Sequence, residues 1–365
     1  MRLIKEDGSL NGLLVILAAR YGLKSGSTFM PPVEMNQFLQ ENWRQNQLLH
    51  AYQITGEPAK DESLEILKKL GCVDEILTPS LSEYEEWGPM DFSNFKMQRA
   101  NLLMGATRTA VVKRLNFFVY CNQGRCVPNL FYLMGGARKL DQLKENEQVL
   151  CTPAGLPFKK GWIQPKQIPT TEASMMQMVW NQSDLPNGWH ATLVDTPMIH
   201  VPGMELGTSR PPNTTETVSH WLLQEQKPGY YIVGSSQPYI EYQRLATERM
   251  HEELLEQGKI NFPCYFKGCG STASPSLPLA TFLDTLAKQF YEEMLCQKWW
   301  TGVFRDHSGA GNMDVGIIMA QGRTEWGARK SMHENLRPNA DQFHLSRRKL
   351  AGPFDTKAQA EKARP

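Results

Sequence analysis

The sequence predicts an α/β fold built on an open, mostly parallel, Rossmann-like sheet of about five strands, with helices flanking the sheet. Two observations lead to this class. Short apolar runs that end in glycine or in small polar residues recur through the middle of the chain. Stretches with helical apolar spacing separate one run from the next. Because strands that alternate with helices pair in parallel through right-handed crossovers, the sheet is expected to be parallel.

The clearest strand signal lies at residues 130–138, where an apolar run ends in Gly135, Gly136 and Arg138. A short apolar run bounded by glycine is typical of a buried strand that enters a tight turn. Comparable runs occupy residues 100–107, 191–196 and 229–236. A fifth run, at residues 260–266, is expected at the sheet edge because Pro263 has no N–H for a central ladder.

Helices are expected between these strands. Residues 108–121 carry an apolar stripe, and further helices are expected to begin at Thr170 or Thr171, at Pro211 with Thr214 as its cap, and at Gln237. A long amphipathic helix is predicted over residues 277–300. The polar stretch 139–168 is long for a connection, so we expect an insertion near the site.

Three segments are predicted from these patterns. Residues 1–95 form a helical N-terminal region packed on the core, with helices near 10–19, 31–39 and 61–70 and a connection over 78–95. Residues 96–300 form the α/β domain. Residues 301–365 form a polar, partly mobile C-terminal extension with one short element near 314–319.

Composition narrows the class of protein. The 365 residues carry 39 Lys and Arg against 38 Asp and Glu, a net charge of +1, which argues against a strong non-specific nucleic-acid binder but leaves room for a local patch. Sequence-specific nucleic acid is not expected as a partner. The apolar stretch 10–19 is too short to span a bilayer, which takes about 20 residues, and its flank is a poor signal peptide. A cytoplasmic protein is expected, with export without a classical signal peptide as the alternative.

The seven cysteines do not suggest a disulfide framework. Two pairs share the same spacing, and each lies beside a predicted strand: Cys121 with Cys126, and Cys264 with Cys269. Four thiolates brought together would suit zinc. Buried, inert thiols are the preferred interpretation.

The predicted site lies beyond the carboxyl ends of the strands, where open α/β sheets bind ligands. Backbone N–H groups at helix starts favour anions, and Arg138 would add a bidentate contact to a phosphate or carboxylate. Tight turns with a surface arginine are the structural alternative. The expected ligand-binding residues follow the strands or open the next helix: Gly105, Ala106, Thr107, Gly135, Gly136, Arg138, Asn213, Thr214, Ser235, Ser236, Gln237 and Tyr239.

Glu172 and Glu216 are the candidate acid–base pair, because each falls in the first turn of a helix that should start at this edge. Compensation of the helix dipole explains either residue equally well. Asn213 and Thr214 are also natural caps. Ser235 and Ser236 lack the surroundings of a nucleophile elbow, and Gly105 is not part of a dinucleotide-binding glycine run.

Taken in order, these motifs resemble the YdcF/SanA/ElyC-like family of bacterial α/β domains. The resemblance covers roughly residues 97–298 and is carried by 104–107, Arg114-Leu115, Gly135-Gly136 with Arg138, 171–173, 212–216, 233–239 with Arg244, and 282–287. This chain has Gln237-Pro238-Tyr239 where the family usually has a polar or histidine-containing segment. The 139–168 insertion and both flanking regions have no counterpart. The resemblance implies links to envelope metabolism and, for one branch, S-adenosylmethionine binding.

The function expected from these observations is that of a small-molecule hydrolase or transferase acting on a phosphorylated or nucleotide-like ligand. A non-catalytic ligand-binding module, for example for S-adenosylmethionine, is one alternative. An exported effector that works through protein interaction is the other.

Overall fold

The computed structural model describes residues 2–5, 8–23, 30–44, 61–79, 97–125, 127–200 and 209–295, together with the backbone of three later strands. The chain folds as two compact units, Cys72–Ser276 and a second unit made of Met1–Gly71 with Leu277–Pro365. The first unit contains the predicted sheet. The second groups residues 277–295 with the N-terminal helices, whereas the sequence places them in the α/β segment.

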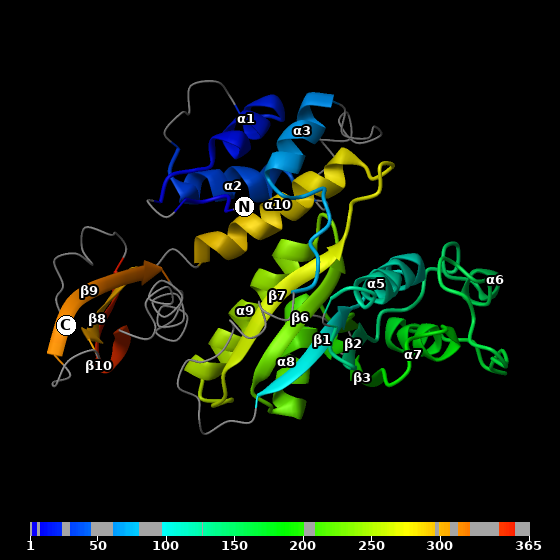
Figure 1. Cartoon of the computed structure of the whole chain (residues 1–365). Coiled ribbons are helices and arrows are strands. Elements are labelled where there is room, and N and C mark those ends of the chain that lie inside the picture. Colours follow the sequence, from blue (N-terminus) through cyan, green and yellow to red (C-terminus); the bar gives the residue numbers. More distant parts are fainter. Residues whose placement is uncertain are drawn as a thin grey trace. The chain divides into compact units, whose positions relative to one another are not determined.

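A five-stranded, all-parallel sheet forms the centre of the first unit (Figure 1), which confirms the predicted fold class. Its order is β3-β2-β1-β6-β7. The strands are β1 (Gln98–Met104), β2 (Leu130–Gly136), β3 (His190–Thr196), β6 (Gly229–Ser236) and β7 (Cys264–Ser271). β7 is an edge strand, as predicted, but it begins after Pro263 rather than before it, because proline cannot donate to the ladder.

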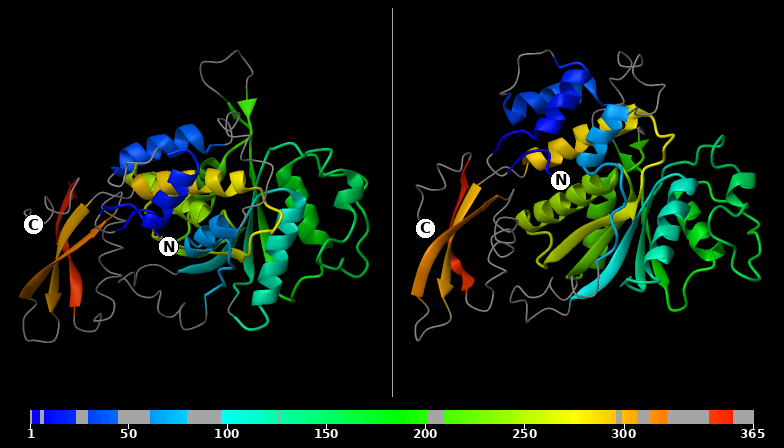
Figure 2. Two further views of the ribbon diagram at one scale, coloured as in Figure 1. Left: turned by 90° about the horizontal axis from the view of Figure 1, so that it is seen from above. Right: turned by 45° about the horizontal axis from the view of Figure 1, so that its top comes forward.

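Helices cover both faces of this sheet (Figure 2). One face packs on α5 (Arg108–Cys121) and α7 (Glu172–Gln182), and the other packs on α8 (Thr214–Glu225) and α9 (Ile240–Glu256). Alternation along each strand produces the two cores: Leu103, Leu133 and Ile232 face α5 and α7. Their neighbours Leu102, Tyr132 and Tyr231 face α8 and α9. Burial of both sheet faces explains why the strands read as continuous apolar runs.

Shorter elements complete this unit. The 139–168 insertion contains the single turn α6 (Glu147–Leu150), and a two-stranded ribbon of β4 (Ile199–His200) and β5 (Ser209–Arg210) precedes α8. Residues 201–208 lie outside the described part of the chain.

The second unit contains α1 (Gly12–Arg20), α2 (Pro32–Asn42), α3 (Asp61–Lys69) and α10 (Leu279–Leu295). α2 packs on α10, where Gln40 Nε2 donates to the carbonyl of Ala287 at 2.9 Å. The buried Glu293 carboxylate accepts from the N–H groups of Leu3 and Ile4 at 2.6 and 3.0 Å. The predicted packing of these helices on the sheet domain stays a prediction, and residues 80–96 of the predicted connection are not described.

Three antiparallel strands follow α10, in the order β10-β8-β9. They are β8 (Trp299–Asp306), β9 (Met313–Gln321) and β10 (Phe343–Phe354). β9 covers the short element predicted near 314–319, whereas β8 takes the two tryptophans that the sequence assigns to the preceding helix. The predicted mobility of the remaining extension concerns residues outside the described part of the chain.

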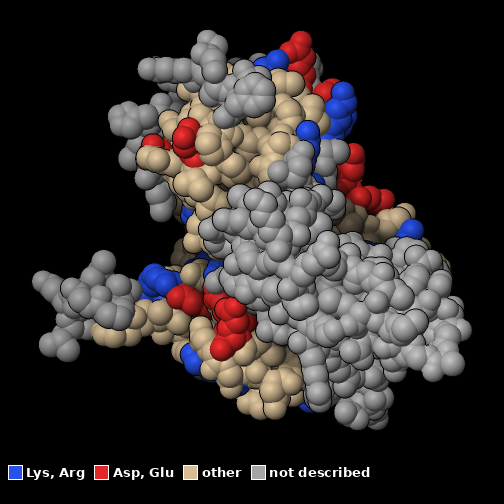
Figure 3. All heavy atoms as spheres, turned by 90° about the vertical axis from the view of Figure 1, so that its left-hand side faces the viewer, with Lys and Arg blue, Asp and Glu red and all other residues tan. Residues whose placement is uncertain are grey.

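None of the described helices is both long and apolar enough to cross a membrane. On the face of the molecule drawn in Figure 3, described Lys and Arg side chains occur among Asp and Glu side chains. This mixture agrees with the overall charge of +1. That sequence-specific nucleic acid is not a partner stays a prediction.

Candidate functional site

The predicted site residues gather at the carboxyl ends of β1, β2 and β6. The connection from β1 runs through α5 on one face of the sheet, and the connection from β6 runs through α9 on the other. β1 and β6 are parallel neighbours, and the order in which the chain adds strands reverses between them, since β2 and β3 lie on one side and β7 on the other. Open α/β sheets bind their ligands at such a switch point.

Gly135 and Gly136 lack side chains, which lets the chain at two helix starts pack closely on β2. A Cβ added to Gly135 would lie 2.6 Å from the α-carbon of Ala173, at the start of α7. A Cβ added to Gly136 would lie 2.6 Å from Cγ of Pro212, just before α8. Since consecutive strand residues point to opposite faces, α7 and α8 begin on opposite faces of β2. Close packing against the chain's own helices therefore explains both glycines.

This arrangement separates the two predicted acid–base residues. Glu172 opens α7 on the face that packs on α5, whereas Glu216 lies in the first turn of α8 on the opposite face. No hydrogen bond or ion pair joins the two carboxylates in the part of the chain that the structure describes. Only Glu172 lies beside Gly105, at the end of β1.

Glu216 belongs to the cap of α8. Its Oε2 accepts from the Asn213 N–H and from Arg210 Nη1, both at 2.8 Å, and its Oε1 accepts from Arg210 Nη2 at 2.5 Å. Asn213 Oδ1 accepts from the Glu216 N–H at 3.0 Å, which completes a capping box. The hydrogen bonds from Arg210 lower the pKa of Glu216. Asn213 is therefore the N-cap, and Thr214, which the sequence assigns to that role, is the first helical residue.

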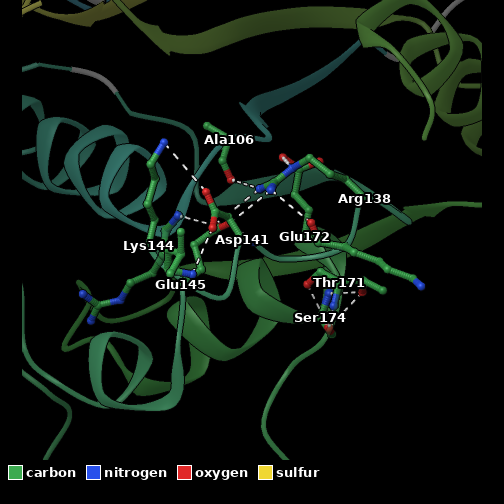
Figure 4. A network of polar contacts seen from close by, with 11 residues as sticks. Ala106, Arg138, Asp141, Lys144, Glu145, Thr171, Glu172 and Ser174 are labelled. Atoms are coloured by element: carbon green, nitrogen blue, oxygen red, sulfur yellow. Dashed lines mark hydrogen bonds and ion pairs between the residues drawn. The ribbon is translucent and has the colours of Figure 1, made fainter. Parts of the chain in front are cut away.

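Arg138 lies between two carboxylates (Figure 4). Its Nη1 donates to Glu145 Oε2 at 3.0 Å, and its Nε donates to Glu172 Oε1 at 3.4 Å. Its Nη2 also donates to the Ala106 carbonyl at 3.2 Å. The guanidinium predicted to bind a ligand anion is thus engaged by the protein's own acidic groups.

Glu145 is the residue of this network that the sequence did not indicate. Its side chain is fully buried, and its Oε1 accepts from the Arg108 N–H, at the start of α5, at 2.9 Å. Its Oε2 also accepts from the Asp141 N–H at 3.1 Å. Burial alone would raise the pKa of Glu145, but the hydrogen bonds from Arg138, Asp141 and Arg108 outweigh it and lower the pKa. An internal carboxylate therefore binds the helix start that was expected to face a ligand anion.

The pKa of Glu172 shifts in the opposite direction. Its Oε1 is bound by Arg138, but no described residue donates a hydrogen bond to its Oε2. A Cβ added to Gly105 would lie 2.9 Å from that oxygen. Burial raises the pKa of Glu172, although the charges of Arg138 and Arg114 oppose the shift. A carboxyl group with a raised pKa and one oxygen free of hydrogen bonds is suited to proton transfer.

Arg114 is the buried cation of this site, and it was recognised in the sequence only as part of the family motif. It projects from α5, and its Nη1 donates to the carbonyls of Met104 and Gly105 at 2.7 and 3.0 Å. It is 3% exposed, forms no ion pair with a described residue, and its Nε has no hydrogen-bond partner. Burial lowers its pKa to about 10, against the charges of Glu172 and Tyr239, so it stays protonated at neutral pH.

The end of β6 contributes groups to both faces. Ser235 Oγ donates to Gln243 Oε1 of α9 at 2.5 Å, so this hydroxyl is engaged on the α9 side. Gln237 Nε2 donates to the Asp74 carbonyl at 2.9 Å, which fixes the turn after the strand. Gly234 faces Phe118 of α5, and alternation therefore turns Ser236 toward the same face. Tyr239 lies near enough to Arg114 to influence its pKa.

The described cysteines do not form a four-thiolate cluster. Cys264 belongs to the core beneath α8 and α9, whereas Cys269 and Cys121 belong to the core beneath α5 and α7. Cys264 and Cys269 therefore lie on opposite faces of β7 and cannot bind one ion together. Cys126 lies outside the described residues, and no group of three or more metal-binding side chains occurs within them.

Comparison with models of known protein families, with curated proteins and with solved structures finds no match for this chain. The site is therefore interpreted from its own geometry. That geometry places Arg114, Glu172 and Ser236 on the α5/α7 face of the sheet, beside Gly105 at the carboxyl end of β1. Tyr239, at the start of α9, lies near enough to Arg114 to influence its pKa.

Proposed function

We propose that this protein is a small-molecule enzyme, a hydrolase or transferase, that acts on a phosphorylated or nucleotide-like ligand bound beyond β1 and β6. The observation that carries the proposal is the buried Arg114, whose Nε has no described hydrogen-bond partner although its Nη1 binds two carbonyls. Glu172 is the described carboxylate whose charge acts on it, and the pKa of Glu172 is raised. A buried cation is strongly unfavourable unless opposite charge and hydrogen-bond acceptors accompany it, and an anionic ligand would add both.

Glu172 supplies the reactive group in this proposal. As a carboxylate it takes a proton from the attacking water or acceptor hydroxyl, which raises the nucleophilicity of that oxygen. The new bond forms to the electrophilic atom of the ligand, and the leaving group departs with the electron pair of the broken bond. Arg114 binds the anionic group and stabilises the negative charge that develops in the transition state.

Arg138 and Glu145 position Glu172 in the same scheme. Glu145 keeps Arg138 in place through the Nη1 contact, and Arg138 fixes one oxygen of Glu172 so that the other is free for the ligand. This division of roles between two carboxylates with opposite pKa shifts is typical of sites in which only one of them transfers protons. Membership of the YdcF/SanA/ElyC-like family is part of this proposal.

A non-catalytic binding module is the second candidate. The observation that favours it is the engagement of Glu216 by Asn213 and Arg210, which leaves Glu172 as the uncommitted carboxylate of the candidate pair. One carboxylate beside one buried cation is sufficient to recognise a zwitterionic ligand such as S-adenosylmethionine.

A thermal-shift screen tests the shared requirement for an anionic ligand. Inorganic phosphate, pyrophosphate, nucleotides, sugar phosphates and S-adenosylmethionine are added separately, and a ligand at 100 times its Kd stabilises the protein by about 2.7 kcal/mol. Arg114→Met is expected to abolish the shift, whereas Lys113→Met, which removes a neighbouring exposed cation of α5, is expected to retain it. A full shift in folded Arg114→Met protein would refute the proposed anion site.

Turnover of the stabilising ligand separates the two candidates. Incubation with the hit, followed by chromatography of the products, is expected to show conversion by the natural protein. Glu172→Gln is expected to bind the ligand and to lose at least 100-fold in kcat, a typical contribution of acid–base catalysis being about 10²–10⁴-fold. Binding without conversion by the natural protein would favour the binding module.

A further inference from the structure

A surface hollow of about 580 Å³ lies between the 139–168 insertion and the outer side of α7, apart from Arg114 and the free oxygen of Glu172. Its volume falls within the range of about 300–1,000 Å³ that small-molecule sites occupy. None of its described lining residues is Asp, Glu, Lys, Arg or His. This neutral lining contrasts with the charged network at the strand ends and indicates a different kind of ligand.

The walls of the hollow are held in place from both sides. The Leu140 N–H donates to the Thr170 carbonyl at 3.1 Å where the insertion begins. The Lys159 N–H donates to the Gln182 carbonyl at 2.7 Å, which ties the insertion to the last turn of α7. Pro165 and Pro169, both lining residues, restrict the backbone between these anchors. The hollow is therefore largely pre-formed, which reduces the entropy lost when a ligand binds.

One wall presents an aromatic face. Trp162 lines the hollow and is partly exposed. Phe158 packs against it with ring centroids 4.7 Å apart and an interplanar angle of 59°, so the indole has a fixed orientation. The neighbouring Ile163 is 84% exposed and adds apolar surface at the rim. A partly exposed indole ring that a neighbouring ring holds in place suits a flat ligand surface made of C–H groups.

The α7 wall of the hollow presents amide groups. Gln177 Nε2 donates to Asn181 Oδ1 at 3.0 Å. This hydrogen bond leaves the Gln177 carbonyl oxygen as an acceptor beside the Asn181 amide donors. Gln167, from the insertion, adds a third amide to the lining. Adjacent acceptors and donors match neighbouring hydroxyl groups, because each hydroxyl both donates and accepts.

We infer that this hollow is a binding site for a neutral sugar ring, which stacks its C–H face on Trp162 and directs its hydroxyl groups to the amides of Gln177 and Asn181. The inference is independent of the proposed reaction, because it uses neither Arg114 nor Glu172. A charged ligand would lose hydration here without gaining an opposite charge. A neutral hydroxylated ring meets the aromatic surface and the amides together.

Saturation-transfer difference NMR tests this site, because it detects weak binding without requiring activity. The full chain is mixed with glucose, N-acetylglucosamine, maltose or cellobiose, and with a proline-rich peptide as a competing class of ligand. Transfer to the ring C–H protons of at least one saccharide is expected. Transfer to the peptide alone, or to none of the saccharides, would overturn the inference.

Variants locate the binding within the chain. Trp162→Ala is expected to abolish saccharide transfer, and Gln177→Ala to reduce it at least twofold; the second variant removes only an amide from the helix surface and leaves the packing of Trp162 intact. Tyr120→Ala is the matched control, because Tyr120 is 57% exposed and does not line the hollow. Equal transfer in folded Gln177→Ala and Tyr120→Ala proteins would place the sugar elsewhere. Arg114→Met is expected to retain transfer, which separates this site from the anion site.

Discussion

The Glu172 carboxylate lies directly over Gly105: a Cβ added to that glycine would come within 2.8 Å of Glu172 Cδ and 2.7 Å of the Met134 carbonyl oxygen. The backbone after β1 can approach the carboxylate only because residue 105 has no side chain. The carbonyl on the other side belongs to β2, so it has little freedom to move. The position of the acidic group thus depends on the absence of one methyl group.

Gly105→Ala is expected to displace Glu172 and to destabilise the sheet edge. Overpacking at such a position costs about 1–3 kcal/mol. Urea unfolding measures this loss, and the thermal shift produced by the screening hit measures the effect on binding. Gly124→Ala is a suitable control, because nothing lies within 4 Å of its added Cβ. An unchanged ligand response in Gly105→Ala would show that the ligand binds away from this carboxylate.

The two carboxylates that share Arg138 are expected to influence stability in different pH windows. The pKa of Glu172 is raised above its ordinary value of 4.5, so the folded state holds this proton more tightly than the unfolded chain does. The stability of the natural protein relative to Glu172→Gln is therefore expected to be greatest below pH 4.5 and to fall as the pH rises through the raised pKa.

The pH dependence of stability expected from Glu145 has the opposite sign. Its pKa is lowered, so its contribution relative to Glu145→Gln is expected to be complete above pH 4.5 and to be lost as the pH falls through the lowered value. Urea unfolding of the natural protein and both variants across pH 3–8 compares the two slopes. Slopes of the same sign for both variants would contradict the division of roles at this site.

Removal of Arg138 is expected to be costly because Glu145 would stay behind, fully buried and without its cation. Arg138→Met should destabilise the protein by about 3 kcal/mol, the usual effect of breaking a buried pair from one side. The double variant Arg138→Met with Glu145→Gln is expected to recover part of the loss. A double-mutant cycle that gives a coupling free energy near zero would contradict the ion pair.

Asn213 and Glu216 are expected to act on stability through the cap of α8. Asn213→Ala should lower the free energy of unfolding by about 1 kcal/mol. Glu216→Gln should have a smaller effect, because glutamine also serves at this position of a capping box. Both proteins are compared by urea unfolding and by kcat on the screening hit. A large fall in kcat at full stability would instead make Glu216 a catalytic residue, as its position in the sequence suggested.

Ser235 and Ser236 are expected to differ although they are neighbours. Ser235→Ala leaves the buried Gln243 oxygen without its donor and should cost about 1–3 kcal/mol. Ser236→Ala, on the face shared with Arg114, should destabilise the protein less than Ser235→Ala, because no described side chain depends on its hydroxyl for a hydrogen bond. The ligand-induced thermal shift should fall only in Ser236→Ala. The reverse pattern would place the ligand on the α9 side of the sheet.

The strands and most helices follow from local patterns, because burial on both faces leaves continuous apolar runs and each run ends at a recognisable turn. Gly135-Gly136 marks the end of β2, and Thr171 caps α7 as expected. β7 is the exception: its start is fixed by Pro263, and its second half, which contains Gly268 and Gly270, lacks a strong apolar signal.

The position of the site also follows from these turns, but the partners of its charged groups do not. Arg138 looked available because its partner, Glu145, lies in a polar insertion without periodicity. Arg114 did give a local signal, since it is a charged residue between Val111 and Phe118 on the buried side of α5. A cation within an apolar stripe indicates either a buried partner or a ligand. Which of the two applies depends on contacts that only the folded chain reveals.

The pairing of β1 with β6 also has a consequence for the order of folding. β1 ends at Met104 and its neighbour β6 begins at Gly229, so this contact closes a long stretch of chain. Closing so long a loop carries an entropic penalty, and non-local pairings of this kind form slowly. The halves of the site, Arg114 with Glu172 and Ser236 with Tyr239, meet only when this closure is complete. A nascent chain released before residue 229 would contain both charged residues without the strand that completes their site.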